Sequence, residues 1–369
     1  MLVLGAGRMG YACALDLSRS GIEVVLGDAE DRRARETAER LGCSWMTVDV
    51  SKDGWTRELP GGLDLVCTAL PLPLGYSSIK ALVEGGFNVV DISILGGEDL
   101  VPIARTAEKR KCYFVPYAGL APGLSHFLSG RAYFELGGLD SLSIYVGGLP
   151  LDPEGKPLAT NLTFSSIAFL EQYVEKSVAR KAGKTVRVDP LAETDFLEVP
   201  EVGELEYFAS GALHSLLDTF PEVQDMAEYT LRWPGHIDQM RLLRNLGLLS
   251  KEKVKLDGVE VAPIHVLGSV FEESLARDPR DLVVLMVEAA RMEKTIRYLL
   301  VQRYDEEQAL TAMAITTGFT QSVMAQMVLG GHLPAEDGKV LPEEVGKDPG
   351  SFEAASTMLR GRGIHIQRL

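Results

Sequence analysis

A glycine-rich segment near the start of the chain has the residue types and spacing of a dinucleotide-binding loop. Gly5, Gly7 and Gly10 form a G-x-G-x-x-G pattern between an apolar strand at 2–4 and a helix-forming stretch at 11–19. The first glycine of such a loop allows a tight turn, the second lets the backbone approach a pyrophosphate, and the third lets helix and strand pack closely. The helix N-terminus presents unpaired N–H groups and partial positive charge to the phosphates.

An acidic residue at the end of the next expected strand points to the identity of the dinucleotide. The apolar run 23–27 ends at Asp28, about 20 residues after the glycines, as the fingerprint requires. Its carboxylate can accept hydrogen bonds from both ribose hydroxyls and would repel a 2′-phosphate, so we expect NAD rather than NADP. Arg32 and Arg33 lie nearby and weaken that preference. The expected cofactor-binding residues are Gly5, Gly7, Arg8, Met9, Gly10, Asp28, Thr68, Ala69, Leu70, Pro71, Asp91 and Ser93.

The first third of the chain alternates strand and helix patterns. Short apolar or β-branched runs occur at 2–4, 24–26, 64–68, 88–91 and 112–115, with polar, periodic stretches between them. Near-continuous apolar strands separated by helices predict a parallel sheet covered on both faces. This is the doubly wound α/β (Rossmann) fold, which binds its ligand at the carboxyl ends of the strands.

The pattern changes after Pro116. Scattered strands without regular crossover helices predict an α+β domain with a mixed sheet, in which we expect a helix over 163–182 and a hairpin around Asp257-Gly258. A long apolar-faced helix is expected at 308–330, and it needs a partner surface, so we predict that it returns to the first domain. This helix carries Thr316-Thr317-Gly318, which is either a packing feature or a contact to the cofactor's amide.

Composition limits the class of protein and its partners. The 369 residues suggest about two domains. Lys and Arg number 37 against 52 Asp and Glu, and the net charge of −15 disfavours nucleic acid and anionic membranes as partners. The four cysteines show no C-x-x-C spacing and the six histidines form no ligand pair, so we expect no metal. Without a signal peptide or a membrane-spanning run, we expect a cytoplasmic protein.

Four segments together resemble the saccharopine dehydrogenase family, and within it the lysine 6-dehydrogenase (L-lysine ε-dehydrogenase) branch. They are the glycine loop, A-G-L-A-P-G-L-S at 118–125, G-G-L-P at 147–150 and L-R-W-P-G-H at 231–236. The resemblance implies a Rossmann domain, a mixed-sheet catalytic domain that also forms a homodimer, and hydride transfer between a nicotinamide cofactor and a carbon bearing an amine. For the lysine branch it implies oxidation of the ε-amine of L-lysine to allysine, which cyclises to piperideine-6-carboxylate.

The resemblance also divides the chain and leaves alternatives open. The expected domains are 1–118 for the dinucleotide, 119–307 for catalysis and dimerisation, and 308–369 as the segment that returns. Ala121 and Ser125 replace two acids of the G-L-D-P-G-x-D-H pattern of saccharopine reductases, which argues for a smaller substrate. Ser210 replaces an acid of the lysine branch's E-A-F-x-T-D-G-L pattern. A saccharopine dehydrogenase or reductase, a carboxy-polyamine-forming reductase and a non-catalytic NAD-binding protein therefore remain alternatives.

Oxidation of an amine by hydride transfer needs a proton acceptor for the amine and a cation for the carboxylate of an amino-acid substrate. The resemblance assigns the cation to Arg232, because it matches the family's substrate-binding R-[YW]-x-G segment. The acid–base candidates are His236, Tyr117 and His126, each of which has a structural role as its alternative. Gly119 and Arg244 are further expected substrate contacts, and Arg241, Glu204 and Glu206 are weaker candidates.

Overall fold

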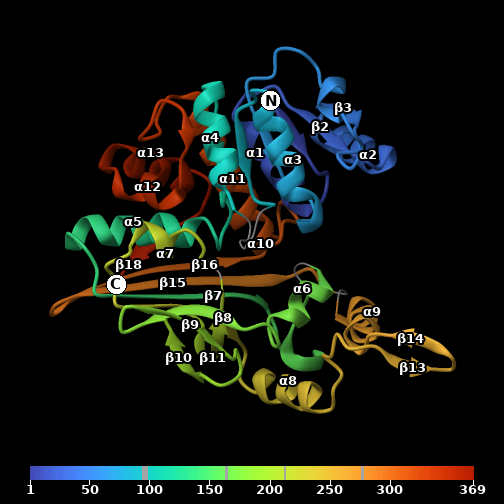
Figure 1. The fold of residues 1–369 in the computed structure, drawn as a ribbon, viewed down its shortest axis with the longest axis vertical. Coiled ribbons are helices and arrows are strands. Elements are labelled where there is room, and N and C mark those ends of the chain that lie inside the picture. The colour runs from blue at the N-terminus through green and yellow to red at the C-terminus, as the bar shows by residue number, and fades with distance from the viewer. Residues whose placement is uncertain (94–98, 163–164, 212, 276–277) are drawn as a thin grey trace. The chain divides into compact units, whose positions relative to one another are not determined.

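The computed structural model describes residues 1–93, 99–162, 165–211, 213–275 and 278–369 (Figure 1). The chain forms two compact units, and each is made of several segments. Unit 1 contains Met1–Gly138, His214–Leu216 and Ala314–His365. Unit 2 contains Leu139–Leu213, Leu217–Met313 and Ile366–Leu369.

Unit 1 is built on a seven-stranded sheet in the order β17-β6-β5-β4-β1-β2-β3, and every neighbouring pair is parallel. Its strands are β1 (Leu2–Leu4), β2 (Val25–Asp28), β3 (Ser44–Thr47), β4 (Val66–Thr68), β5 (Val89–Asp91), β6 (Tyr113–Val115) and β17 (Gly338–Lys339). The connecting helices are α1 (Arg8–Arg19), α2 (Asp31–Leu41), η1 (Trp55–Glu58), α3 (Leu72–Glu84) and α4 (Val101–Arg110). The predicted doubly wound parallel fold is confirmed.

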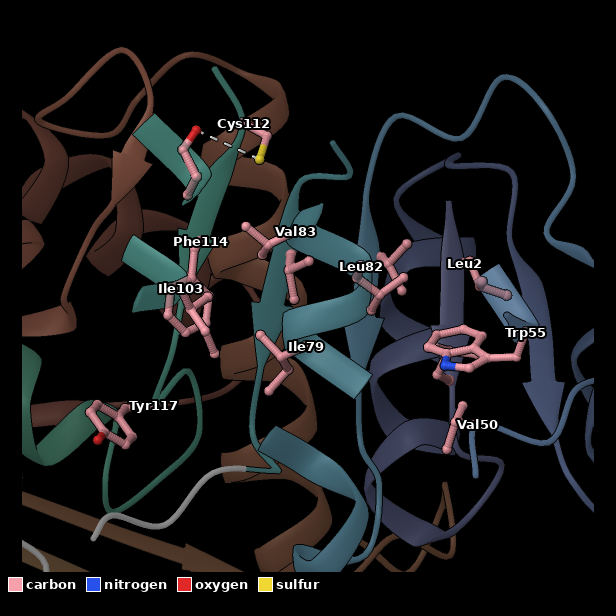
Figure 2. Close-up of a cluster of buried hydrophobic side chains, with 14 of the residues drawn as sticks. Leu2, Val50, Trp55, Ile79, Leu82, Val83, Ile103, Cys112, Phe114 and Tyr117 are labelled. Carbon is pink, nitrogen blue, oxygen red and sulfur yellow. Dashed lines mark hydrogen bonds between the residues drawn. The ribbon is translucent and has the colours of Figure 1, made fainter. Parts of the chain in front are cut away.

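The central strands of this sheet are apolar because both of their faces are covered. Every residue of β1, β4 and β5 is buried. On one side, Ile79 and Leu82 of α3 pack in a cluster with Leu2 and Phe114 of the sheet (Figure 2). Tyr117, just after β6, belongs to the same cluster. The carboxyl ends of β1, β4 and β5 are thereby held at one rigid edge.

The C-terminal part of the chain returns to unit 1, as predicted. It contains α10 (Ala312–Ala314), the π-helix η3 (Ile315–Phe319), α11 (Thr320–Leu329), α12 (Pro342–Lys347) and α13 (Pro349–Arg360). The Gln321 amide donates to the carbonyls of Thr68 (2.9 Å) and Val90 (3.0 Å), which joins α11 to β4 and β5. The Asp16 carboxylate on α1 accepts from Ser322 (2.6 Å) and from the Arg362 guanidinium (2.7 Å).

The T-T-G segment of this returning helix is a packing feature at its glycine. A Cβ on Gly318 would lie 2.6 Å from the Cβ of Ala12 and 2.7 Å from the carbonyl oxygen of Met9. The absence of a side chain therefore lets η3 approach α1 closely. Such close approach fixes the end of α1 that follows the glycine loop.

Unit 2 contains a nine-stranded mixed sheet whose main path is β10-β11-β12-β7-β15-β16-β18, with β8 and β9 paired beside β12. The strands are β7 (Ser141–Pro150), β8 (Ser177–Lys181), β9 (Lys184–Val188), β10 (Thr194–Val199), β11 (Gly203–Ser210), β12 (Asp225–Arg232), β15 (Asp281–Arg291), β16 (Lys294–Arg303) and β18 (Ile366–Arg368). The β12–β7 pair is parallel, whereas the other pairs are antiparallel. The predicted mixed-sheet α+β domain is confirmed.

The helices and turns of the remaining chain depart from the prediction in one place. They are α5 (Leu124–Leu136) in unit 1, then η2 (Pro157–Ala159), α6 (Ser166–Glu171), α7 (Leu216–Thr219), α8 (His236–Asn245) and α9 (Pro263–Leu275). The hairpin of β13 (Val254–Leu256) and β14 (Val259–Val261) confirms the expected turn at Asp257-Gly258. The helix predicted over 163–182 is wrong beyond Glu171, and its residues 163–164 lie outside the described part. The chain turns there and enters β8, because Arg180 and its neighbours pair with β9.

Candidate functional site

The glycine loop of unit 1 has the geometry of a cofactor cradle. Gly5 has a φ of +102°, and a Cβ there would overlap the carbonyl oxygen of Ala69. A Cβ on Gly10 would overlap the Gly5 carbonyl, whereas Gly7 has no atom within 4 Å of its Cβ position. Gly5 and Gly10 therefore allow the turn to pack, and Gly7 leaves open space in front of the N-terminus of α1. A pyrophosphate fits this arrangement.

Asp28, at the end of β2, is fixed beside the loop by backbone donors. Its Oδ2 accepts from the N–H of Ala6 at 2.8 Å, and its Oδ1 accepts from the N–H of Glu30 at 2.9 Å. The Arg33 guanidinium lies 3.6 Å from Oδ1 and also pairs with Glu30. Arg32 points to Glu36 on the exposed side of α2, at 2.7 Å. Both arginines, which in the sequence weaken the expected preference for NAD, are thus paired with acidic side chains at the end of β2 or in and just before α2.

The ends of β4 and β5 form a hydrogen-bonded edge next to this loop. Asp91 Oδ1 accepts from the Thr68 hydroxyl (2.6 Å) and from the N–H of Ser93 (2.7 Å). The Ser93 hydroxyl accepts from the N–H of Leu70 at 2.7 Å. Thr68, Asp91 and Ser93 are buried, so their side chains organise the edge, while Leu70 is half-buried and Pro71 is exposed. These positions bring the expected cofactor residues together on one sheet edge.

Three rings meet at the same edge of unit 1. Ala118 donates its N–H to the Asp91 carbonyl (2.8 Å), which brings Tyr117 to the end of β5. The ring centroids of Tyr117 and His126 are 6.1 Å apart. His214, from the segment before α7, stacks on Tyr117 with centroids 5.2 Å apart and lies 6.2 Å from His126. The sequence reasoning placed Tyr117 and His126 among the candidates but missed His214, which no motif marked.

Gly119 and Thr317 belong to the surroundings of these rings. A Cβ on Gly119 would lie 3.2 Å from the Thr317 methyl group and 3.5 Å from a methyl group of Ile92. His126 is fully buried, and its Nδ1 hydrogen-bonds the Ser125 hydroxyl at 3.0 Å. The loop therefore packs closely against η3, and its backbone forms part of the carboxyl edge of the sheet.

Arg232, at the end of β12 in unit 2, is a buried cation held by neutral groups. It is 3% exposed. Its Nε donates to the Tyr173 hydroxyl (2.9 Å), its Nη2 to the Gln172 side-chain oxygen (3.0 Å) and its Nη1 to the Leu231 carbonyl (2.9 Å). The guanidinium lies 5.2 Å from the centroid of the Phe169 ring. No carboxylate of the described residues forms an ion pair with it, so neutral hydrogen-bond acceptors and the face of an aromatic ring surround its charge.

His236, the first residue of α8, orients this cation through Tyr173. Its Nδ1 donates to the Leu158 carbonyl at 2.7 Å, which leaves Nε2 as the acceptor of the Tyr173 hydroxyl proton at 2.7 Å. Burial, and then the charge of Arg232, lower the pKa of His236 to about 3. The imidazole is therefore neutral, and both of its nitrogens are engaged within the protein.

The remaining charged candidates of unit 2 are paired or serve the fold. Glu206 accepts from the backbone N–H groups of Ile237 (2.5 Å) and Gly235 (3.1 Å) at the start of α8, and burial raises its pKa. Arg244 pairs with Asp189 at 2.8 Å and also donates to the Tyr173 carbonyl. Arg241 pairs with Asp238 at 2.8 Å, and Glu204 is exposed. Of the predicted site residues in unit 2, Arg232 and His236 lie together, because both hydrogen-bond the Tyr173 hydroxyl.

Two family models together match nearly the whole chain. Residues 1–120 match the model of the saccharopine dehydrogenase NADP binding domain, and residues 119–364 match that of the saccharopine dehydrogenase C-terminal domain. Apo saccharopine dehydrogenase (L-Glu forming) from Saccharomyces cerevisiae is a similar solved structure, with a TM-score of 0.80, 19% identity, and coverage of 100% of this chain and 98% of that one. A probable dehydrogenase from Thermotoga maritima has a TM-score of 0.48 and 13% identity over 100% and 98% of the two chains, too distant to carry an argument.

Within the described ranges, no cluster of three or more His, Cys, Asp or Glu side chains has the arrangement of a metal site. In the same part of the chain, no helix combines the length and the apolar character needed to cross a membrane.

Proposed function

The chain belongs to the saccharopine dehydrogenase family, a family of oxidoreductases, and from this premise we propose that it oxidises the ε-amine of L-lysine with NAD. After the hydride leaves, water hydrolyses the resulting iminium and ammonium is released, and the product is allysine, which cyclises to piperideine-6-carboxylate. The observation that carries the proposal is the buried guanidinium of Arg232, which neutral groups orient and which no carboxylate of the described chain neutralises. A substrate carboxylate supplies the missing charge partner.

The proposal assigns the cofactor to the glycine loop of unit 1. The N–H groups at the start of α1 bind the pyrophosphate, and Asp28 accepts hydrogen bonds from the ribose hydroxyls. Bound in this loop, NAD would supply the acceptor for the hydride of the ε-carbon. NAD is favoured over NADP because the backbone N–H groups of Ala6 and Glu30 hold the Asp28 carboxylate in place. In addition, the Arg33 guanidinium is engaged by the carboxylates of Asp28 and Glu30. The matched family model is named for NADP. A comparison of the affinities for NAD and NADP therefore tests the proposed choice of cofactor directly.

Arg232 gives the substrate its orientation in the proposal. His236 keeps the Tyr173 hydroxyl turned so that its oxygen accepts from Arg232 Nε, and the guanidinium is thereby fixed. A fixed guanidinium loses little conformational entropy when it binds a carboxylate. The amine must lose a proton before its carbon can give up a hydride, since free lysine titrates near ~10.4.

We also propose that the protein is a homodimer and that it is cytoplasmic. The four free cysteines of the chain are consistent with the reducing conditions of that compartment.

Saccharopine is the main alternative substrate, because the family name and the yeast structure refer to it. Saccharopine carries more charged groups than lysine. Arg241 and Arg244, which could balance such groups, are already paired with Asp238 and Asp189. This pairing favours the smaller substrate.

The test is the rise of absorbance at 340 nm with NAD and each of lysine, saccharopine and shorter diamino acids. We expect lysine to be oxidised, and the exchange Arg232→Ala to lower kcat/KM for lysine by roughly 150- to 25,000-fold, since two charge-assisted hydrogen bonds contribute about 1.5–3 kcal/mol each and about 3–6 kcal/mol together. The Arg241→Ala variant is the matched control. Unchanged NAD affinity shows that unit 1 of each variant is folded. Turnover of saccharopine alone, or of no amine, contradicts the proposal.

A further inference from the structure

His214 reaches unit 1 from a part of the chain that otherwise belongs to unit 2. The three residues His214–Leu216 group with unit 1, whereas the chain on both sides of them groups with unit 2. On the C-terminal side, the buried guanidinium of Arg180 holds the carbonyls of Leu217 (2.5 Å), Phe220 (2.7 Å) and Val223 (3.3 Å). The segment that carries His214 is therefore anchored directly after it.

The backbone at both stacked rings is strained. His214 has a φ of +40° and Tyr117 a φ of +59°. Left-handed conformations are uncommon for residues other than glycine, although histidine and asparagine adopt them more readily than most. Strained residues of this kind persist where the surrounding structure imposes them, and they cluster at functional sites. Here the strain turns two rings face to face at 14° between their planes.

Of the three rings, His214 is the accessible one. Tyr117 is 5% exposed and His126 is fully buried, whereas His214 is half-buried. The contacts of its side chain with described residues are ring contacts with Tyr117 and His126, and none of them is a hydrogen bond to its nitrogens. A half-buried imidazole whose nitrogens have no hydrogen-bond partner among the described residues is able to bind a ligand through them.

On the basis of the proposed function, we infer that His214 is a substrate-contacting residue that accepts a hydrogen bond from the nitrogen of the amine being oxidised. Tyr117 and the imposed backbone hold the imidazole at the carboxyl edge of the sheet, where doubly wound folds bind their ligands. The contact selects a primary amine and orients it beside the cofactor. His214 thus acts in specificity and positioning, with the proton of the amine leaving to solvent.

The charge state of the ring explains the preference for an amine over a carboxylate. Burial, and then the neighbouring His126, lower the pKa of His214 to about 3. A neutral imidazole offers one lone pair to an N–H donor, and it lacks the positive charge that would attract a carboxylate. The edge of unit 1 therefore offers a neutral acceptor for the amine of the substrate.

Two substitutions separate this role from a packing role. His214→Phe keeps a ring to stack on Tyr117 but removes the acceptor, whereas His214→Asn loses the ring, keeps a polar acceptor and tolerates the left-handed backbone. We expect the Phe variant to lose about 10–100-fold in kcat/KM for lysine, the effect of one hydrogen bond to a charged group. The Asn variant should stay within about fivefold of the wild type, while NAD affinity is unchanged in both.

Each result has a defined meaning. An active wild type whose Phe variant keeps its kcat/KM, or whose Asn variant loses as much as the Phe variant, overturns the role of His214 and leaves the proposed function intact. If the Phe variant fails to bind NAD, the Asn variant alone decides, because a packing role requires the ring. A wild type that oxidises no amine overturns the proposed function and the inference together.

Discussion

Replacement of Asp28 by alanine should erode the preference for NAD, and the structure allows the size of the effect to be estimated. The carboxylate is about nine-tenths buried, since its side chain is 10% exposed, and two backbone N–H groups fix its direction. Hydrogen bonds from ribose hydroxyls to an ionised carboxylate contribute about 1.5–3 kcal/mol. Loss of the carboxylate should therefore weaken NAD binding by roughly 10–100-fold.

The same substitution should strengthen NADP binding, because it removes an electrostatic repulsion. Two like charges 4 Å apart cost about 4 kcal/mol at an effective dielectric constant of 20, and salt reduces this value. Arg33, now 3.6 Å from Asp28 and paired with Glu30, is then free of one acidic partner and can turn to a 2′-phosphate. The ratio of the two affinities should shift toward NADP by about 100-fold or more.

Calorimetric titration of NAD and NADP without any substrate measures this ratio. Because Ala6 and Glu30 lose an acceptor, the variant should also be destabilised by about 1–3 kcal/mol, so titrations are made well below its melting temperature. Asp31→Asn is the matched control, since Asp31 begins α2 and accepts from Thr47 rather than from the loop. An unchanged ratio in Asp28→Ala would refute the assignment of Asp28 to the ribose.

Two further predictions concern stability. Arg362→Ala should lower the free energy of unfolding by about 3 kcal/mol in urea, because it leaves the buried carboxylate of Asp16 without its cation, and a change below 1 kcal/mol would exclude a stabilising role for the pair. His236 should make the protein less stable in acid: the unfolded chain binds a proton near pH 6.5 and the folded chain only near pH 3, so the free energy of unfolding falls by about 1.4 kcal/mol per pH unit in that range. His236→Gln should remove this part of the slope in chemical denaturation between pH 4 and 6, and an unaltered slope would show that the imidazole does not titrate on unfolding.

The parallel sheet of unit 1 was predictable because its signals are local. Each central strand is a short, continuous apolar run, and Gly5 and Gly10 occupy positions where a side chain would collide with the turn. The returning C-terminal helix was predictable for a related reason, since a helix apolar on so many sides must be buried. Gly5 and Gly10 thus indicate both the tight turn of the fold and the dinucleotide-binding loop that this turn forms.

The prediction failed where distant contacts decide the structure. The stretch after Glu171 has helical character, yet it forms β8, which pairs with β9 and β12, and the Arg180 side chain binds carbonyls about 40 positions along the chain. His214 had no motif, and its importance comes from its stacking on Tyr117, nearly 100 residues earlier in the chain. Sequence reasoning could propose Arg232 as a cation, but its lack of a carboxylate partner is a property of the fold.

The buried charges of unit 2 argue for a substrate with a single carboxylate. In unit 2, Arg232 is a cation surrounded by neutral groups, and the nearby Arg244 is already balanced by Asp189. An amino acid with one carboxylate matches this arrangement, whereas each additional carboxylate of a larger substrate would need a further unpaired cation. The specificity for lysine is therefore expected to depend on which cations the fold leaves unpaired, more than on the size of the site.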